Sequence, residues 1–304
     1  MNFKLALFAL GHGRRWAHGA ALLLLALALT ACSAIKLGYN NAPSLAHTYL
    51  SSAVDWDDKQ STQLRRSLEN IVAWHRNNEL TVIAAQLEQA TIRLVNKPDS
   101  QNPITPVELE VYYTTIQGSL ARTALAAAPE IAKTMLMLWP NQIQQIQRAL
   151  DESNQEYREQ RLQSNPGKRL EATAKRMEKR FERWLGSLNT TQRARIKQWA
   201  EQSQSYSEAR YQQRLQRQEE FMRLVTLAAN RQIEEAALSK QVATLLTAWQ
   251  NPSTAQARQV AQARLADTLQ LVADVLNTAS PQQKQRAAER ASGWAQDLTV
   301  LARG

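Results

Sequence analysis

Residues 105–128 read TPVELEVYYTTIQGSLARTALAAA, and this stretch indicates the fold class of the whole chain. Thr105 is followed by Pro106 and then by Glu108, which is the capping box of a helix start with proline at the first helical position. Good helix formers dominate the rest, so the stretch predicts one continuous helix. Pro129 comes next and predicts a kink or a new helix, because proline has no backbone amide to donate.

The composition extends this pattern along the chain. Glycine occurs nine times in 304 residues and aromatic residues make up 6%. Ala, Leu, Gln, Arg and Glu dominate, which favours helix and leaves few strand-forming residues. We therefore expect an all-α protein, either a multi-helix bundle or an extended helical array. The break Asn165-Pro166-Gly167 divides it into a predicted N-terminal helical half, 43–164, and a C-terminal helical half, 168–304.

Helix starts recur in one form in the second half. Asn189 lies three residues before Gln192, Ser280 lies three residues before Gln283, and Leu238 begins the similar run Leu-Ser-Lys-Gln. Asn and Ser are good helix N-caps, so each run predicts the first turn of a helix. The helices expected in this half after residue 189 span about 190–203, 207–234, 239–250, 254–277 and 281–302.

The first 31 residues are typical of an export signal. Lys4, Arg14 and Arg15 stand in a stretch without acidic residues, and an apolar run with four consecutive leucines follows. That run is much shorter than the about 20 residues that a permanent transmembrane helix needs. We expect residues 1–31 to be removed from the mature protein.

The sequence Leu29-Thr30-Ala31-Cys32 matches the lipobox of bacterial lipoproteins. Its chemistry requires a thiol that receives a diacylglyceryl group, preceded by small residues that give a peptidase access to the bond. Cleavage between Ala31 and Cys32 leaves Cys32 as the first residue, carrying diacylglycerol and an N-acyl chain. Because Cys32 is the only cysteine, lipidation excludes disulfides and any other cysteine chemistry.

Residues 32–42 then form a short lipidated tether, so the membrane is one expected partner. Several acyl chains make such an anchor effectively permanent. Ser33 stands where an aspartate would signal retention in the inner membrane. We therefore expect the protein on the periplasmic face of the outer membrane of a Gram-negative bacterium.

The formal net charge of +10 is concentrated in one segment. The export signal carries three of these charges, and residues 168–197 account for the excess that remains. The candidate partner-binding side chains of this basic face are Lys175, Arg176, Lys179, Arg180 and Arg183. The face is either a solvated helix surface or a binding surface for an acidic protein, a lipid headgroup or lipopolysaccharide. Export argues against a nucleic-acid partner.

No catalytic or metal-binding constellation stands out. Only His47 and His75 remain after export, and neither has a second ligand at helical spacing. There is no glycine-rich phosphate loop and no serine elbow. We expect no enzymatic activity, no metal and no cofactor other than the lipid on Cys32. Within Trp74-His75-Arg76, the histidine either orders helix packing through a hydrogen bond or has a binding or pH-sensing role.

Four further motifs carry a resemblance. They are Gly38-Tyr39-Asn40-Asn41-Ala42, Trp74-His75-Arg76, Glu156-Tyr157-Arg158-Glu159, and Trp184-Leu185-Gly186 with Leu188 and Gln192. With the lipobox, they make the chain similar to a family of uncharacterised proteobacterial lipoproteins that share a domain of unknown function. The resemblance covers most of residues 29–200, implies the lipid anchor and supplies no activity. One departure is Trp139, which stands where a small polar helix cap is expected.

Two hypotheses about function follow. The first is a non-enzymatic, lipid-anchored periplasmic binding or scaffolding protein that uses the basic face on an acidic partner. The second is a periplasmic folding chaperone, because the helix starts are similar to those of small stress chaperones and lipase-specific foldases. An enzyme is a third class, and it would require a cleft that gathers His75 and carboxylates.

Overall fold

The computed structural model describes residues 34–96, 102–163, 165–248 and 254–304. Only helices occur in these ranges, which confirms the predicted all-α class. The predicted signal, residues 1–31, and the cleavage site Ala31-Cys32 lie outside the described residues. The helices are α2 (Ala42–Ser51), α3 (Asp58–Asn78), α4 (Leu80–Val95), α5 (Pro106–Met135), α6 (Pro140–Arg161), α7 (Pro166–Leu185), α8 (Thr190–Ser203), η1 (Gln204–Tyr206), α9 (Ser207–Ala229), α10 (Glu235–Thr247), α11 (Ala255–Asn277) and α12 (Pro281–Ala302).

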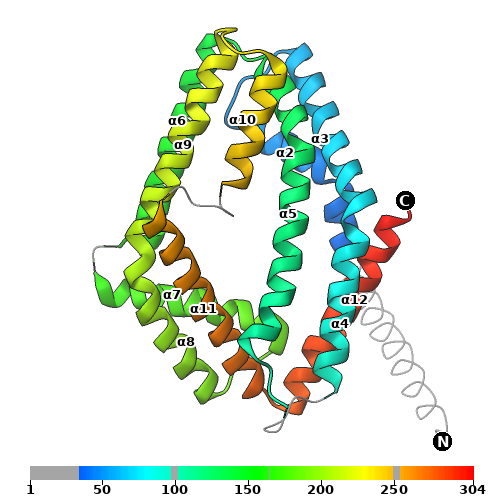
Figure 1. Ribbon diagram of the computed structural model, residues 1–304, viewed down its shortest axis with the longest axis vertical. Coiled ribbons are helices and arrows are strands. Elements are labelled where there is room, and N and C mark those ends of the chain that lie inside the picture. The colour runs from blue at the N-terminus through cyan, green and yellow to red at the C-terminus, as the bar shows by residue number, and fades with distance from the viewer. Residues whose placement is uncertain (1–33, 97–101, 164, 249–253) are drawn as a thin grey trace, which may run out of the picture.

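The helices form an elongated frame (Figure 1). α6 and α9 lie side by side along one edge, and α3, α4 and α12 form the opposite edge. α5 runs lengthwise next to α3, and α10 packs against both α5 and α9 at one end of the frame. α7, α8 and α11 pack together at the other end. The architecture is an extended helical array.

Two clusters of buried apolar side chains hold the ends of this frame. At one end α5, α9 and α10 share a core in which Ala132, Leu224 and Leu238 are each 0% exposed. At the other end α7, α8, α11 and α12 share a second core, where Ile196 and Val275 are also 0% exposed. The first core, and the packing of α4 along α12, join helices from before and after the sequence break at Pro166.

Three sequence-based helix boundaries are wrong. α9 ends at Ala229 instead of residue 234. α5 continues through Pro129 to Met135, because the buried alanines on both sides of the proline pack into the first core and offset the lost hydrogen bond. α10 begins at Glu235 instead of residue 239, after the extended N-cap residue Glu234. The run that starts at Leu238 therefore lies inside the helix, where Leu238 faces the core.

A pair of glutamines joins the starts of α3 and α6. Gln60 and Gln142 are each 2% exposed, and each is the third residue of its helix. The Nε2 of Gln60 donates to Oε1 of Gln142 at 3.0 Å, and the Nε2 of Gln142 donates back at 2.8 Å. Each Oε1 also accepts the backbone N–H of its own N-cap, Asp57 or Trp139. The pair thus caps two helices and ties them together.

A second glutamine pair joins the starts of α8 and α12 in the same way. Gln192 and Gln283 exchange hydrogen bonds of 3.1 Å in both directions, and each caps its own helix through the N–H of Asn189 or Ser280. We call these two pairs the glutamine junctions. They explain why the same helix start recurs along the chain, since its glutamine has a partner on another helix as well as a capping role.

Candidate functional site

Two adjoining cavities lie between the helices on the α9 side of the frame. The small chamber, of about 210 Å³, is lined by residues of α6, α7, α8, α9 and α11. The large chamber, of about 1020 Å³, is lined by residues of α6, α9, α10 and α11. Tyr157, Arg210 and Arg264 line both chambers, so the two adjoin at these side chains. We refer to both together as the arginine cavity.

Every basic side chain that lines the arginine cavity is an arginine. The seven are Arg161 of α6, Arg176 and Arg180 of α7, Arg210, Arg214 and Arg217 of α9, and Arg264 of α11. The spacing of four and then three residues places the α9 arginines on one face of that helix. Four helices, α6, α7, α9 and α11, therefore contribute guanidinium groups to one cavity.

These arginines have no carboxylate partner. No ion pair involves any of them within the ranges that the structure describes. Glu220 is the single acidic residue among the described lining residues. Its two carboxylate oxygens accept from Nε and Nη2 of Arg223 at 2.8 and 2.7 Å. The cavity therefore holds a large excess of positive charge without a counter-ion in the protein.

The electrostatic effect is visible in the guanidinium pKa values. Burial lowers the pKa of Arg264 below its ordinary value, and the neighbouring Arg210 and Arg217 lower it further. Burial likewise lowers the pKa of Arg217, with added repulsion from Arg214 and Arg210. All remain protonated at neutral pH. A bound anion would relieve both the lost hydration and the mutual repulsion.

The same causes act on Arg176 in the small chamber. Burial lowers its pKa first, followed by repulsion from Arg161, Arg180 and Arg210. Its nearest partners are neutral, since it donates to the carbonyl oxygen of Gln160 at 3.2 Å and to Oγ1 of Thr173 at 2.9 Å. The side chain is thus held in place without its charge being neutralised.

Arg214 is held in a similar way at the edge of the large chamber. Its Nε donates to Oδ1 of Asn154 at 2.7 Å, its Nη2 donates to Oγ of Ser153 at 2.8 Å, and its guanidinium carbon lies 5.3 Å from the centre of the Tyr157 ring. Tyr157 in turn stacks on Tyr211, with ring centres 5.6 Å apart. These contacts fix the orientation of Arg214 and leave its charge available to a ligand.

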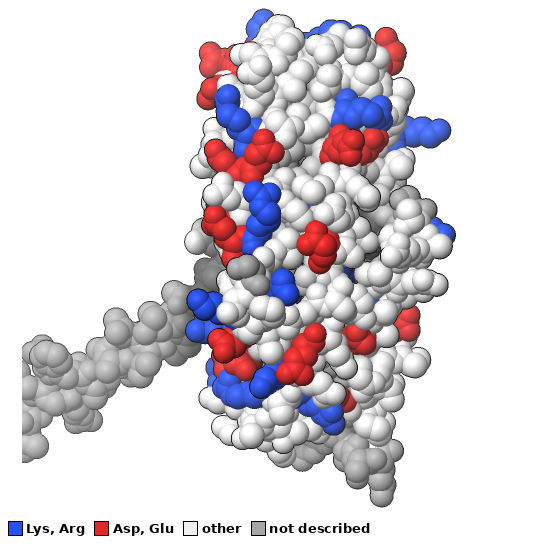
Figure 2. Space-filling view, turned by 90° about the vertical axis from the view of Figure 1, so that its left-hand side faces the viewer, with Lys and Arg blue, Asp and Glu red and all other residues white. Residues whose placement is uncertain are grey.

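The predicted basic face is divided by the structure. Arg176 and Arg180 line the small chamber, whereas Lys175, Lys179 and Arg183 line neither chamber. Arg176 is partly buried, and the other four are exposed. The edge of the frame that carries α6 and α9 shows basic and acidic side chains next to one another (Figure 2). The predicted face is therefore shared between the small chamber and the exposed side of α7.

Part of the basic segment is neutralised within the protein. Nη1 and Nη2 of Arg193 lie 2.7 and 3.0 Å from carboxylate oxygens of Glu178 and Glu182. Nε of Arg195 lies 3.8 Å from Oδ2 of Asp274. These arginines hold α8 against α7 and α11, so the segment 168–197 is not a single basic surface.

Sequence reasoning missed most of the cavity. Arg210, Arg214 and Arg217 carried a signal in their spacing on one helix, within a Gln-rich stretch that reads as a solvated helix. Tyr157 stands in the Glu-Tyr-Arg-Glu motif. Arg264 is an isolated basic residue on an ordinary amphipathic helix, and no local pattern distinguishes it.

The triplet Trp74-His75-Arg76 lies outside the arginine cavity. Nδ1 of His75 is 2.8 Å from the hydroxyl oxygen of Tyr39, and burial lowers the pKa of this imidazole. Nη2 of Arg76 donates to Oδ1 of Asn40 at 2.8 Å, and its Nη1 donates to the carbonyl oxygen of Leu301 at 3.1 Å. His75 and Arg76 therefore fasten the first described residues of the chain to α3, and Arg76 also ties α3 to the end of α12.

Two kinds of feature are absent from the described residues. No group of three or more His, Cys, Asp and Glu side chains in these ranges is arranged to hold a metal ion. None of the helices described is both long and apolar enough to cross a membrane. His47, the other histidine expected in the mature chain, contacts Oγ of Ser61 through Nε2 at 2.8 Å.

The fold and this cavity define an all-α protein with an arginine-lined cavity between its helices. The chain belongs to the Family of unknown function (DUF6279), whose model matches residues 52–251. The match includes six of the seven cavity arginines, and Arg264 on α11 lies beyond it. No curated protein and no solved structure matches the chain.

Proposed function

We propose that this protein is a lipid-anchored binding protein on the periplasmic face of the outer membrane, and that its arginine cavity holds an anionic ligand. The observation that carries the proposal is the set of seven arginines that line one cavity without a carboxylate partner. Guanidinium groups bind phosphate and carboxylate through paired hydrogen bonds, and they are more weakly hydrated than the ammonium group of lysine. The proposed role is binding, with no chemical step.

The anion proposal is tested by thermal unfolding of the full-length protein in non-ionic detergent. Sodium phosphate is compared with sodium chloride at equal ionic strength, so that general screening cancels. A ligand that binds only the folded state raises the unfolding midpoint. We expect phosphate to raise the midpoint of the wild type and to have no such effect on the double variant Arg176→Gln/Arg264→Gln.

The matched control is Lys175→Gln/Lys179→Gln, which removes the same charge from the exposed face of α7. We expect this variant to keep the full response to phosphate. Equal responses of both double variants would contradict the proposal. Unfolding midpoints in chloride alone show whether either variant is damaged before any ligand is added.

The anchor is tested separately. The lipobox and the sole cysteine support lipidation of Cys32. In a Gram-negative host grown with labelled palmitate, the wild type should carry the label and fractionate with the outer membrane. Cys32→Ala should lose both, and Ser33→Ala serves as the control that retains both. Label on the Cys32→Ala protein would refute the anchor, and Ser33→Asp should move the labelled protein to the inner membrane.

A further inference from the structure

The two chambers differ in chemistry. The small chamber combines five of the arginines with a ring of hydroxyl groups from Tyr157, Thr173, Ser203, Ser207 and Thr268. The large chamber adds an apolar wall made by α10 and α11, formed by Leu245, Ala248, Ala257, Val260 and Ala261. One end of the cavity is therefore suited to an oxyanion and the other to hydrocarbon.

The position of the shared residues links the two chambers. Arg210 and Arg264 line both, so one bound molecule can place its charged group against these arginines and extend its apolar part along α10 and α11. The volume of about 1020 Å³ lies at the upper end of the range of about 300–1,000 Å³ that is usual for ligand sites. Inorganic phosphate alone would leave the large chamber unused.

We propose that the ligand is a phosphorylated amphiphile, with its phosphate in the small chamber and its hydrocarbon in the large one. This inference rests on the proposed function and names the class of anion. Phosphate is favoured over carboxylate because several guanidinium groups from different helices converge on one small chamber, and a phosphate monoester offers three terminal oxygens and up to two charges to them.

The experiment compares three soluble probes by isothermal titration of the full-length protein in non-ionic detergent. The probes are octyl phosphate, inorganic phosphate and octyl glucoside. We expect octyl phosphate to bind at least tenfold more tightly than inorganic phosphate, which equals about 1.4 kcal/mol or the burial of about two methylene groups. We expect no binding of octyl glucoside, because it lacks the charge.

Substitutions of two lining residues test where the hydrocarbon and the phosphate of the ligand bind. Val260→Asn should reduce the affinity for octyl phosphate to that for inorganic phosphate and leave the latter unchanged. Val300→Asn on α12 is the matched control, since Val300 is 53% exposed and lines neither chamber. This control variant should bind octyl phosphate as the wild type does. The probe partitions into detergent to the same extent in every titration, so a difference between the variants reports on the protein. Arg264→Gln should weaken the binding of both phosphates.

The outcomes separate this inference from the proposed function. Equal affinity for the two phosphates would overturn the inference and leave the anion site intact. If neither octyl phosphate nor inorganic phosphate binds, the inference and the proposed anion site are both overturned. Equal binding of octyl phosphate and octyl glucoside would show an apolar site without anion recognition, which also overturns both.

Discussion

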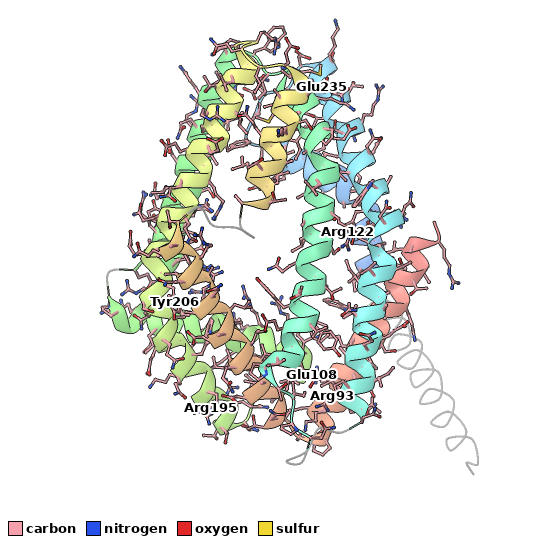
Figure 3. The ribbon with its side chains drawn as sticks, in the orientation of Figure 1. Arg93, Glu108, Arg122, Arg195, Tyr206 and Glu235 are labelled. Atoms are coloured by element: carbon pink, nitrogen blue, oxygen red, sulfur yellow. The ribbon has the colours of Figure 1, made fainter. Side chains whose placement is uncertain are left out.

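The arginines on the two long edges of the frame differ in their partners. Beside the edge of α3 and α4, Nε of Arg93 lies 2.7 Å from Oε1 of Glu108 (Figure 3), and Nε of Arg122 lies 2.7 Å from Oε1 of Glu79. Beside the edge of α6 and α9, the cavity arginines form no ion pair with a described carboxylate. The same residue type thus occurs in two opposite electrostatic settings.

The difference separates charges that stabilise the fold from charges that serve a ligand. A buried carboxylate without a partner is costly, so a paired arginine contributes to stability chiefly by preventing that loss. A cluster of arginines without carboxylates gains no ion pair for the fold and carries a repulsion that an anion from outside can relieve. Removing a cavity arginine for which no hydrogen bond to the protein is described should therefore affect stability in the opposite sense from removing a paired arginine.

The largest effect is expected for Arg122→Ala. Glu79 lies between α3 and α4 with its side chain 1% exposed, and Arg122 supplies two hydrogen bonds of 2.7 Å to its carboxylate. The substitution leaves this buried charge without its cation, so we expect a loss of about 3 kcal/mol in the free energy of unfolding. Urea unfolding measures it. Arg148→Ala on the exposed face of α6 is the control, and an equal loss there would contradict the explanation.

The next effect is expected at a glutamine junction. Gln192→Ala removes the cap of Asn189 and leaves the amide of Gln283 with one fewer partner in a buried place. A buried polar group without its hydrogen bond costs about 1–3 kcal/mol, and we expect a loss of about 2 kcal/mol. The control is Gln202→Ala, on the exposed face of the same helix. If both variants unfold at the same urea concentration, the junction has no role in stability.

A smaller effect is expected from mild acid at the paired edge. Burial holds the pKa of His75 below its ordinary value of 6.5. The unfolded chain therefore binds a proton more readily than the folded protein, and stability falls as the pH drops below 6.5. The pKa of Glu79 is also lowered, mainly by its hydrogen bonds to Arg122, but its loss of stability begins at lower pH. Urea unfolding at pH 7 and 5.5 should show a decrease that His75→Gln reduces.

The sequence predicted the helices well because their signals are local. Caps such as Thr105 and Ser280, and runs of good helix formers, lie within a few residues of the feature that they specify. The exception at Pro129 is instructive, since tertiary burial around it outweighs the local rule. Long-range packing also decides which helix starts are joined by glutamines.

The cavity could be predicted only in part because its residues come together through packing. Arg176 and Arg180 were identified as basic candidates, but the pattern on α7 does not show whether a face is directed to solvent or to another helix. Arg264 contributes from α11, which follows α8, α9 and α10 in the chain. The absence of counter-ions is a property of the assembled helices, and no single segment displays it.

The smallest effect, and the one that most sharpens the comparison, is expected for two arginines of α9. Arg217 is directed into the large chamber and repelled by Arg214 and Arg210, whereas Arg223 on the same helix is paired with Glu220. Without ligand, Arg217→Gln should leave the free energy of unfolding unchanged or raise it by roughly 0.3 kcal/mol, because repulsion between exposed like charges is of this size. Arg223→Gln should lower it by roughly 0.5 kcal/mol, the value of an exposed ion pair.

Replicate urea titrations of both variants measure the sign of the change in the free energy of unfolding. A loss of stability in Arg217→Gln as large as in Arg223→Gln would mean that the cavity arginines stabilise the fold, and the division between the two edges would then be wrong.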